Sequence, residues 1–130
     1  MTTVPMKKTV LVADHADARL STILAGYELV FVRTLDEAKE TLTGRNFDLI
    51  VIGVHFDESR MFDLLRHVRW QERHRATPVV CVLTTDFSRP AIAAEGLEIA
   101  VKALGGTAYI DLKSLGDRET RGIVDDLLGA

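Results

Sequence analysis

The chain has 130 residues, 47% of them hydrophobic, and carries a formal net charge of -3. This length supports one domain with a substantial core and is too short for two ordinary domains, so we predict a single domain over residues 1–130. The negative charge gives no overall attraction to nucleic acid or anionic lipid. We therefore expect neither a nucleic-acid partner nor a membrane partner.

The cysteine usage and the N-terminal segment indicate the compartment. Cys81 is the only cysteine and lies inside the apolar run Val79 to Leu83, where a buried and inert thiol is expected. The apolar stretch that begins at Thr9 ends at Asp14, which is too short for a signal-peptide core or a membrane span. We expect a cytoplasmic protein without an internal disulfide.

Short β-rich runs alternate with helical patterns along the chain. The runs predict five strands, at Thr9 to Ala13, Glu28 to Val32, Leu49 to Val54, Val79 to Leu83 and Ala108 to Leu112. Alternation of this kind is typical of a parallel sheet with helices on both faces. We predict an α/β fold with a doubly wound, flavodoxin-like sheet of strand order 2-1-3-4-5.

Helix signals lie between these strands. They predict helices over Asp17 to Ala25, Thr34 to Leu42 and Ser59 to Arg69, a fourth from near Pro90 to Gly105-Gly106, and a last one over Asp117 to Leu128. Thr34 with Glu37 three residues later is a capping-box pattern. Met61, Leu64, Leu65 and Val68 form the apolar stripe of the third helix.

Three segments resemble response-regulator receiver domains. Residues 48–53, Asp-Leu-Ile-Val-Ile-Gly, are similar to the "DLILLD" strand of that family, and residues 10–14 match its opening "ILVVD". Residues 105–114, which end in Lys113-Ser114, are similar to "AGADGYLTKPF". The resemblance covers nearly the whole chain and implies a receiver fold and a role in two-component signal transduction.

The resemblance also implies a degenerate phosphorylation site. The phospho-accepting aspartate of the family corresponds to Gly53, which has no carboxylate oxygen for in-line attack on a phosphoryl group. The acidic pair that holds magnesium corresponds to Asp14-His15, which leaves Asp14 as the one obvious oxygen ligand. We therefore expect no bound metal, no cofactor and no enzymatic activity.

The remaining switch positions of the family match in part. Thr84 is the local match to the switch threonine, although counting from Pro78 puts Leu83 in its place. Lys113 matches the lysine after the fifth strand. Ile110 takes the switch-aromatic position, and Tyr109 points to the opposite face of the strand. The degenerate site thus comprises Asp14, His15, Gly53, Thr84 and Lys113.

Two sharper interpretations of this region compete with ordinary ones. Asp57, four residues after Gly53, could be a displaced acceptor, but we favour a role at the start of the third helix with Ser59 as N-cap. His15 and His55 could bind a transition metal with Asp14, but we favour ordinary polar residues at strand ends.

The third helix combines basic and aromatic side chains away from its apolar stripe. Arg66 and Arg73 share a face with Phe62, and Trp70 lies beside them. Arginine and tryptophan are frequent in protein-binding hot spots. The simpler alternative is a solvated face whose Trp70 packs against the loop to Pro78.

The fourth helix has more apolar surface than packing on one side of a sheet requires. Ile99, Val101 and Leu104, with Tyr109 of the fifth strand, form the predicted contact surface. In receivers the fourth helix, fifth strand and fifth helix dock partners or a second protomer. We expect a homodimer or a contact with another protein here.

These observations favour a pseudo-receiver, a phosphorylation-independent module that binds a protein partner such as a signalling kinase or regulator. One alternative is a phosphorelay receiver that accepts phosphate at an unusual residue. Another is a small-molecule-binding flavodoxin-like domain, although the loop after the first strand lacks a phosphate-binding run of glycines.

Overall fold

The computed structural model describes residues 7–14, 18–83 and 91–129. Its centre is a parallel sheet of five strands in the order β2-β1-β3-β4-β5. The strands are β1 (Thr9–Ala13), β2 (Glu28–Val32), β3 (Leu49–Gly53), β4 (Val79–Leu83) and β5 (Ala108–Asp111). The predicted fold class and strand order are confirmed, and the predicted strand bounds agree to within one residue.

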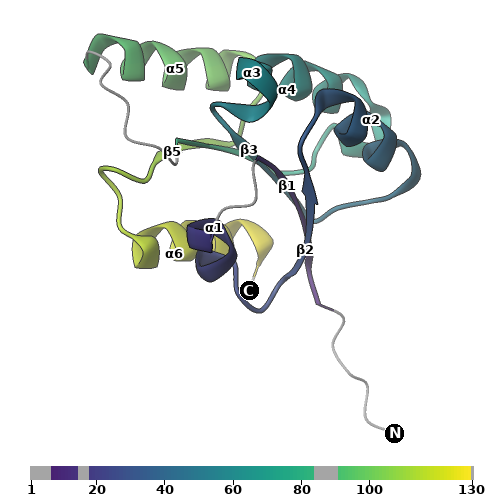
Figure 1. Ribbon diagram of the computed structural model, residues 1–130, viewed down its shortest axis with the longest axis horizontal. Coiled ribbons are helices and arrows are strands. Elements are labelled where there is room, and N and C mark those ends of the chain that lie inside the picture. Colours follow the sequence, from purple (N-terminus) through teal and green to yellow (C-terminus); the bar gives the residue numbers. More distant parts are fainter. Residues whose placement is uncertain (1–6, 15–17, 84–90, 130) are drawn as a thin grey trace, which may run out of the picture.

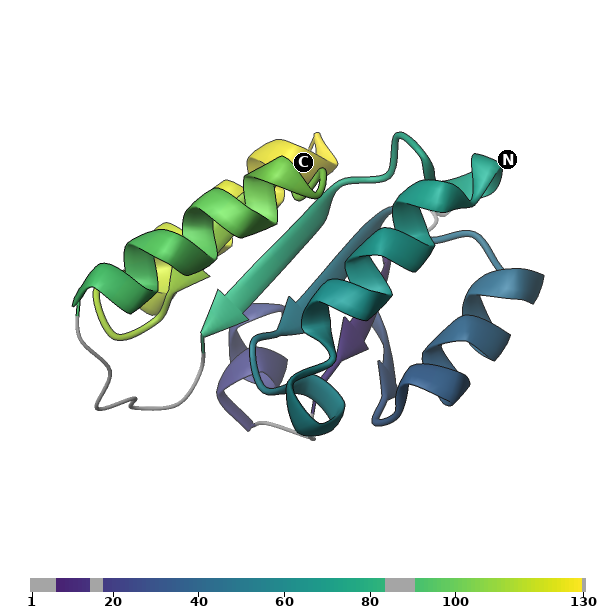
Figure 2. The same cartoon turned by 90° about the horizontal axis from the view of Figure 1, so that it is seen from above.

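Helices cover both faces of the sheet (Figure 1). They are α1 (Ala18–Ile23), α2 (Leu35–Gly44), α3 (Phe56–Ser59), α4 (Met61–Trp70), the 3-10 turn η1 (Glu72–His74), α5 (Ala91–Ala103) and α6 (Asp117–Leu128). Helices α1 and α6 lie on one face, and α2, α3, α4 and α5 lie on the other (Figure 1). Figure 2 shows α4 and α5 side by side in the same layer, one on each side of β4.

The core consists of two apolar clusters, one on each face of the sheet. Side chains alternate along a strand, so successive residues enter opposite clusters. Ile50 and Ile52 lie in the cluster under α2, α4 and α5, whereas Leu49 and Val51 lie in the cluster over α1 and α6. All residues of β3 and β4 are buried, which explains their continuous apolar sequence.

The helix ends follow local sequence signals. Thr34 caps α2, because its hydroxyl oxygen accepts a hydrogen bond from the backbone N–H of Glu37 at 3.1 Å, as predicted. Gly105 follows α5 with φ +96°, a left-handed conformation that favours glycine. Helix α1 is shorter than predicted and ends at Ile23, and Gly26 (φ +97°) makes the turn into β2.

The prediction of a single third helix with Ser59 as its N-cap was wrong. The chain instead makes the short turn α3, and α4 begins after Arg60, which occupies the N-cap position. Asp57 and Glu58 have φ values of 43° and 55°, which interrupt a right-handed helix. The Asp57 carboxylate points away to α2, where Oδ2 accepts the backbone N–H of Leu35 at 2.8 Å.

No helix within the part of the chain that the structure describes is long and apolar enough to cross a membrane.

Candidate functional site

The carboxyl ends of the strands bring Asp14 and Gly53 together. Asp14 follows β1, and Gly53 is the last residue of the adjacent strand β3. Asp14 is only 5% exposed. A Cβ atom added at Gly53 would overlap the Asp14 carboxyl group, with Oδ1 at 2.8 Å and Cγ and Oδ2 closer still. The Asp14 carboxylate therefore occupies the space that a side chain at position 53 would need.

The absence of a side chain at position 53 is thus a packing requirement. Gly53 does not adopt the left-handed conformation that only glycine tolerates well, so its backbone does not explain the residue. Lack of space explains the glycine, because an aspartate side chain at position 53 would fit only if Asp14 moved. The structure does not offer a vacated acceptor pocket at this position.

The neighbouring strands end in Leu83 and Asp111. The β3–β4 register pairs Gly53 with Val82, and the β4–β5 register pairs Leu83 with Asp111. Leu83 is buried in the core on the α4 and α5 side, so this strand end contributes an apolar group. Thr84, the local match to a switch threonine, lies outside the described residues, as does His15.

Lys113 is exposed two residues after β5, and its backbone N–H donates to Asp111 Oδ1 at 2.9 Å. The Asp57 carboxylate accepts a hydrogen bond from the backbone N–H of Leu35 at the N-terminus of α2. His55 occupies the N-cap position of α3. Among the described residues, no group of three His, Cys, Asp or Glu side chains could hold a metal ion.

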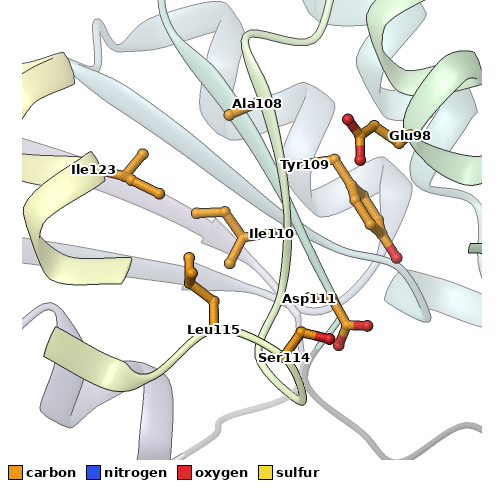
Figure 3. A pocket seen from close by; sticks show the side chains of 8 residues that line it. All are labelled: Glu98, Ala108, Tyr109, Ile110, Asp111, Ser114, Leu115 and Ile123. Carbon is orange, nitrogen blue, oxygen red and sulfur yellow. The ribbon is translucent and has the colours of Figure 1, made fainter. Parts of the chain in front are cut away.

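A hollow of about 360 Å³ lies where α5, β5 and α6 meet (Figure 3). Apolar side chains of Ala108, Ile110, Leu115 and Ile123 line it. Its polar lining residues are Glu98, Tyr109, Asp111 and Ser114. Tyr109 and Glu98 lie on one side of β5, and Ile110 and Ile123 lie on the other (Figure 3). The hollow therefore spans the edge strand and carries two carboxylates and no cation among its lining residues.

Tyr109 and Ile110 point to opposite faces of β5, as predicted. Ile110 is buried with α1 and α6, whereas Tyr109 packs against the core under α4 and α5. The Tyr109 hydroxyl is buried and has no hydrogen-bond partner among the described residues. Burial raises the pKa of Tyr109, and the carboxylates of Asp111 and Glu98 raise it further. Tyr109 is therefore a neutral aromatic wall of the hollow.

The predicted contact residues on α5 differ in exposure. Ile99 is 69% exposed, which suits a contact residue. Leu104 and Tyr109 are half-buried and pack against the core. Val101 is fully buried, so its assignment to a partner-binding surface was wrong. The reason is that Val101 points to the sheet, where it belongs to the core with Leu65 and Val68.

Trp70 and its neighbours lie at the carboxyl end of α4. Trp70 is 86% exposed, so the alternative in which it packs against the loop to Pro78 was wrong. Arg66 and Arg73 are exposed as well. Arg66 reaches Asp63 only at 3.9 Å. We call Arg66, Trp70 and Arg73 the Trp70 surface.

The neighbouring Arg69 has a different role. Its guanidinium donates hydrogen bonds to the carbonyl oxygens of Gly105 at 2.7 Å, His74 at 3.0 Å and Thr77 at 2.7 Å. These bonds join the end of α4 to the loop before β4 and to the turn after α5. Burial lowers the pKa of Arg69. Arginine side chains nevertheless remain charged in proteins.

Cys81 lies in the centre of β4 and is fully buried. Burial raises the pKa of its thiol to about 12, so the thiolate that a nucleophile or metal ligand requires does not form near neutral pH. The predicted burial of this thiol is confirmed.

The arrangement resembles one group of solved structures. No protein-family model and no curated protein matches the chain. A response regulator from Thermotoga maritima superposes with a TM-score of 0.73 at 20% identity, over 96% of this chain and 100% of that one. CheY4 of Vibrio cholerae superposes with a TM-score of 0.72 at 24% identity, over 95% and 99%.

The signal receiver domain of a histidine kinase from Syntrophus aciditrophicus has a TM-score of 0.72 at 27% identity, over 94% of this chain and 90% of that one. The chain has the receiver fold. In this fold the Asp14–Gly53 contact lies at the carboxyl edge of the sheet, where ligands of doubly wound folds bind. The hollow lies at the outer edge, on β5.

Two features of the structure were not predicted from the sequence. One is the acidic hollow, because Asp111, Ser114 and Ile123 come together only after β5 and α6 have packed. The other is the set of backbone hydrogen bonds that Arg69 makes. The one sequence signal for a special role was its position beside the apolar stripe of α4, where an arginine is poorly solvated.

Proposed function

We propose that the chain is a cytoplasmic pseudo-receiver, a phosphorylation-independent module that acts in signal transduction by binding another protein. The contact between Asp14 and Gly53 carries this proposal. A receiver phosphorylated in the ordinary way needs a free carboxylate at the end of β3, and here the carboxylate of Asp14, the residue after β1, fills that space. The solved receiver structures support the signalling role through their common fold.

The output of such a module is a protein contact. The outer side of α5 and the hollow on β5 offer Ile99, half-buried Leu104 and Tyr109, and two carboxylates for that contact. A signalling kinase, a regulator or a second copy of the chain would bind to this surface. No small molecule or catalytic step is needed for this output.

The test is an amide NMR titration of the full chain, first with magnesium and then with beryllofluoride as a phosphoryl mimic. We expect the amides of Asp14, Gly53, Asp111 and Lys113 to show no saturable shift with either addition, because no acceptor carboxylate projects from β3. A catalytically ordinary receiver, titrated in the same buffer, supplies the positive control.

Saturable shifts around Asp14 and Lys113 would contradict the proposal and indicate an acceptor at an unusual residue. The same titration of the variant Asp14→Ala would then decide whether Asp14 is that acceptor. If it is, the saturable shifts should disappear in the variant. Magnesium shifts alone, without any beryllofluoride effect, would show a cation site and leave phosphorylation independence intact.

A further inference from the structure

Trp70 is an apolar side chain that the fold leaves in water. At 86% exposure it contributes almost nothing to the core. Burial of a tryptophan removes about 150–250 Å² of surface from water, so the exposed Trp70 does not contribute the large hydrophobic free energy of folding that a buried tryptophan would. Tryptophan is also the residue type most enriched in binding hot spots. Its position therefore points to a partner.

The support beneath Trp70 is rigid. Arg69 ties the end of α4 to Gly105, His74 and Thr77 through carbonyl hydrogen bonds. The buried His74 ring contacts the carbonyl oxygen of Leu42 at 3.2 Å and so joins η1 to α2. A preorganised surface loses little conformational entropy when it binds, which favours association.

The charge around Trp70 indicates the chemistry of its partner. Residues 60–75 hold five arginines against one aspartate and one glutamate, a net charge of +3, so the rest of the chain carries -6. Among the described residues, no carboxylate lies within 4.0 Å of Arg60, Arg73 or Arg75. The partner should therefore present carboxylates beside an apolar recess.

The hollow on β5 has these properties. Its floor is apolar, its volume of about 360 Å³ is sufficient for an indole ring, and Glu98 and Asp111 supply negative charge. Lys102 contacts Glu98 at 3.3 Å, but both side chains are at least half exposed, so this pair is weak and easily replaced. The chain thus carries both a basic aromatic surface and an acidic apolar recess.

We propose that Trp70 of one copy of the chain docks in the hollow of a second copy, with Arg66 and Arg73 beside Glu98 and Asp111. This inference rests on the proposed function, in which the output is a constitutive protein contact, and it specifies the two surfaces that form that contact. The two surfaces are on different helices, so the contact is heterologous and joins copies head to tail. A pair of copies joined in this way keeps one free Trp70 surface on one copy and one free hollow on the other.

The test is sedimentation velocity on the full chain from about 10 μM to about 1 mM, where weak contacts become populated. We expect the weight-average mass to rise above 14.4 kDa with concentration and to pass twice that value without a plateau. High salt should reduce the mass, because exposed charge pairs are screened.

Two variants separate the two halves of the contact. Trp70→Ala removes the docking side chain, and Ser114→Arg places bulk and positive charge in the hollow at an exposed position. Each variant alone should stay near 14.4 kDa, with association weakened by more than about thirtyfold as for a hot-spot residue. Mixed together, they should form a complex of twice that mass and no larger, because one intact surface and one intact hollow remain.

Arg33→Glu is the matched control for Arg73→Glu, since Arg33 is an exposed arginine directly after β2 and lies outside the proposed contact. It should associate like the unmodified chain. Circular dichroism of each variant establishes that it is folded, and Arg73→Glu provides a second variant that should weaken association by about tenfold.

Three outcomes would overturn the inference. They are a monomer at every concentration, a plateau at two copies, and loss of association in Ile99→Ala with retention in Trp70→Ala. The last two would indicate a symmetric dimer through α5. None of these three outcomes bears on phosphorylation. A beryllofluoride response in the NMR titration would overturn the proposed function, and the sedimentation experiment could still be interpreted.

Discussion

At the residue scale, the decisive feature is that the Asp14 carboxylate occupies the space that a side chain at position 53 would need. Gly53 provides room, and the carboxylate of Asp14 fills it. Neither residue is informative alone, because a glycine can end a strand for many reasons and an aspartate can follow one. Their contact makes the missing side chain at position 53 a matter of packing, so adding a side chain there has a structural cost.

This contact predicts the stability of Gly53→Ala. The added methyl group would force Asp14 out of its buried position, and we expect a loss of about 1–3 kcal/mol in the free energy of unfolding, as for other overpacked sites. In the background of Asp14→Ala the same change should cost less, since the obstructing carboxylate is gone. Urea denaturation of the four proteins gives the coupling energy.

Gly122→Ala is the matched control. Gly122 lies inside α6, and a Cβ atom there would meet nothing within 4 Å. This substitution should stabilise the chain by about 0.5–1 kcal/mol, because alanine is the better helix former. Equal effects of Gly53→Ala in both backgrounds would show that Asp14 does not fill the space in solution.

At the element scale, Arg69 holds α4, β4 and α5 in place. A guanidinium offers five N–H donors in a rigid fork, and Arg69 uses them on carbonyl groups of Gly105, His74 and Thr77. These carbonyls lie in the turn after α5, at the end of η1 and in the loop before β4. The same side chain therefore sets the exit of α4 and the geometry of the Trp70 surface.

We predict that Arg69→Lys destabilises the chain by roughly 2–4 kcal/mol, because an ammonium group cannot reach three separated carbonyls and leaves some without donors. Thermal and urea denaturation measure the effect. Arg66→Lys, at an exposed position nearby with one contact at 3.9 Å, should change stability by less than about 0.5 kcal/mol. Similar losses for both variants would argue against a specific role for Arg69.

At the scale of the whole molecule, the order of the helices and strands is easier to predict from the sequence than the contacts between them. The β-branched runs predict all five strands, and Thr34 and Gly105 mark helix ends through local hydrogen bonds and backbone conformation. The role of Asp57 was not predictable, because its partner Leu35 lies 22 residues earlier in the chain. Such tertiary hydrogen bonds leave no periodic signal.

The candidate site shows the same division. The sequence shows that position 53 has no carboxylate, whereas the position of the Asp14 carboxylate depends on the β1–β3 register and a side-chain rotamer. On α5 the sequence indicates an apolar excess but not its distribution, so Val101 and Ile99 looked alike although one is buried and one exposed. Exposure follows from helix orientation, which packing decides.

The stability of the whole molecule should depend on pH through two groups with opposite charge. Burial lowers the pKa of His67 from its ordinary value of 6.5, and electrostatic repulsion from Lys39 and His74 lowers it further. As the pH falls below 6.5 the unfolded chain binds a proton at His67 before the folded chain does. Proton binding then favours unfolding, so stability falls from pH 6.5 downward until the folded-state pKa is passed.

Asp125 acts in a separate, more acidic window. Hydrogen bonds from Tyr27 and Arg121 lower the pKa of Asp125 from its ordinary value of 3.8. Its contribution is fully present above pH 3.8 and is lost as the pH falls through the folded-state pKa, because the unfolded chain protonates first.

Urea denaturation at pH 7.5, 5.0 and 3.0 separates the two groups. We expect His67→Gln to remove part of the stability difference between pH 7.5 and pH 5.0 while leaving the loss between pH 5.0 and pH 3.0. Asp125→Asn should do the reverse, because amide and carboxylic acid alike lack the charge that Arg121 contacts at 2.7 Å. An unchanged slope between pH 7.5 and pH 5.0 in His67→Gln would mean that groups other than this half-buried imidazole set the dependence of stability on pH in that range.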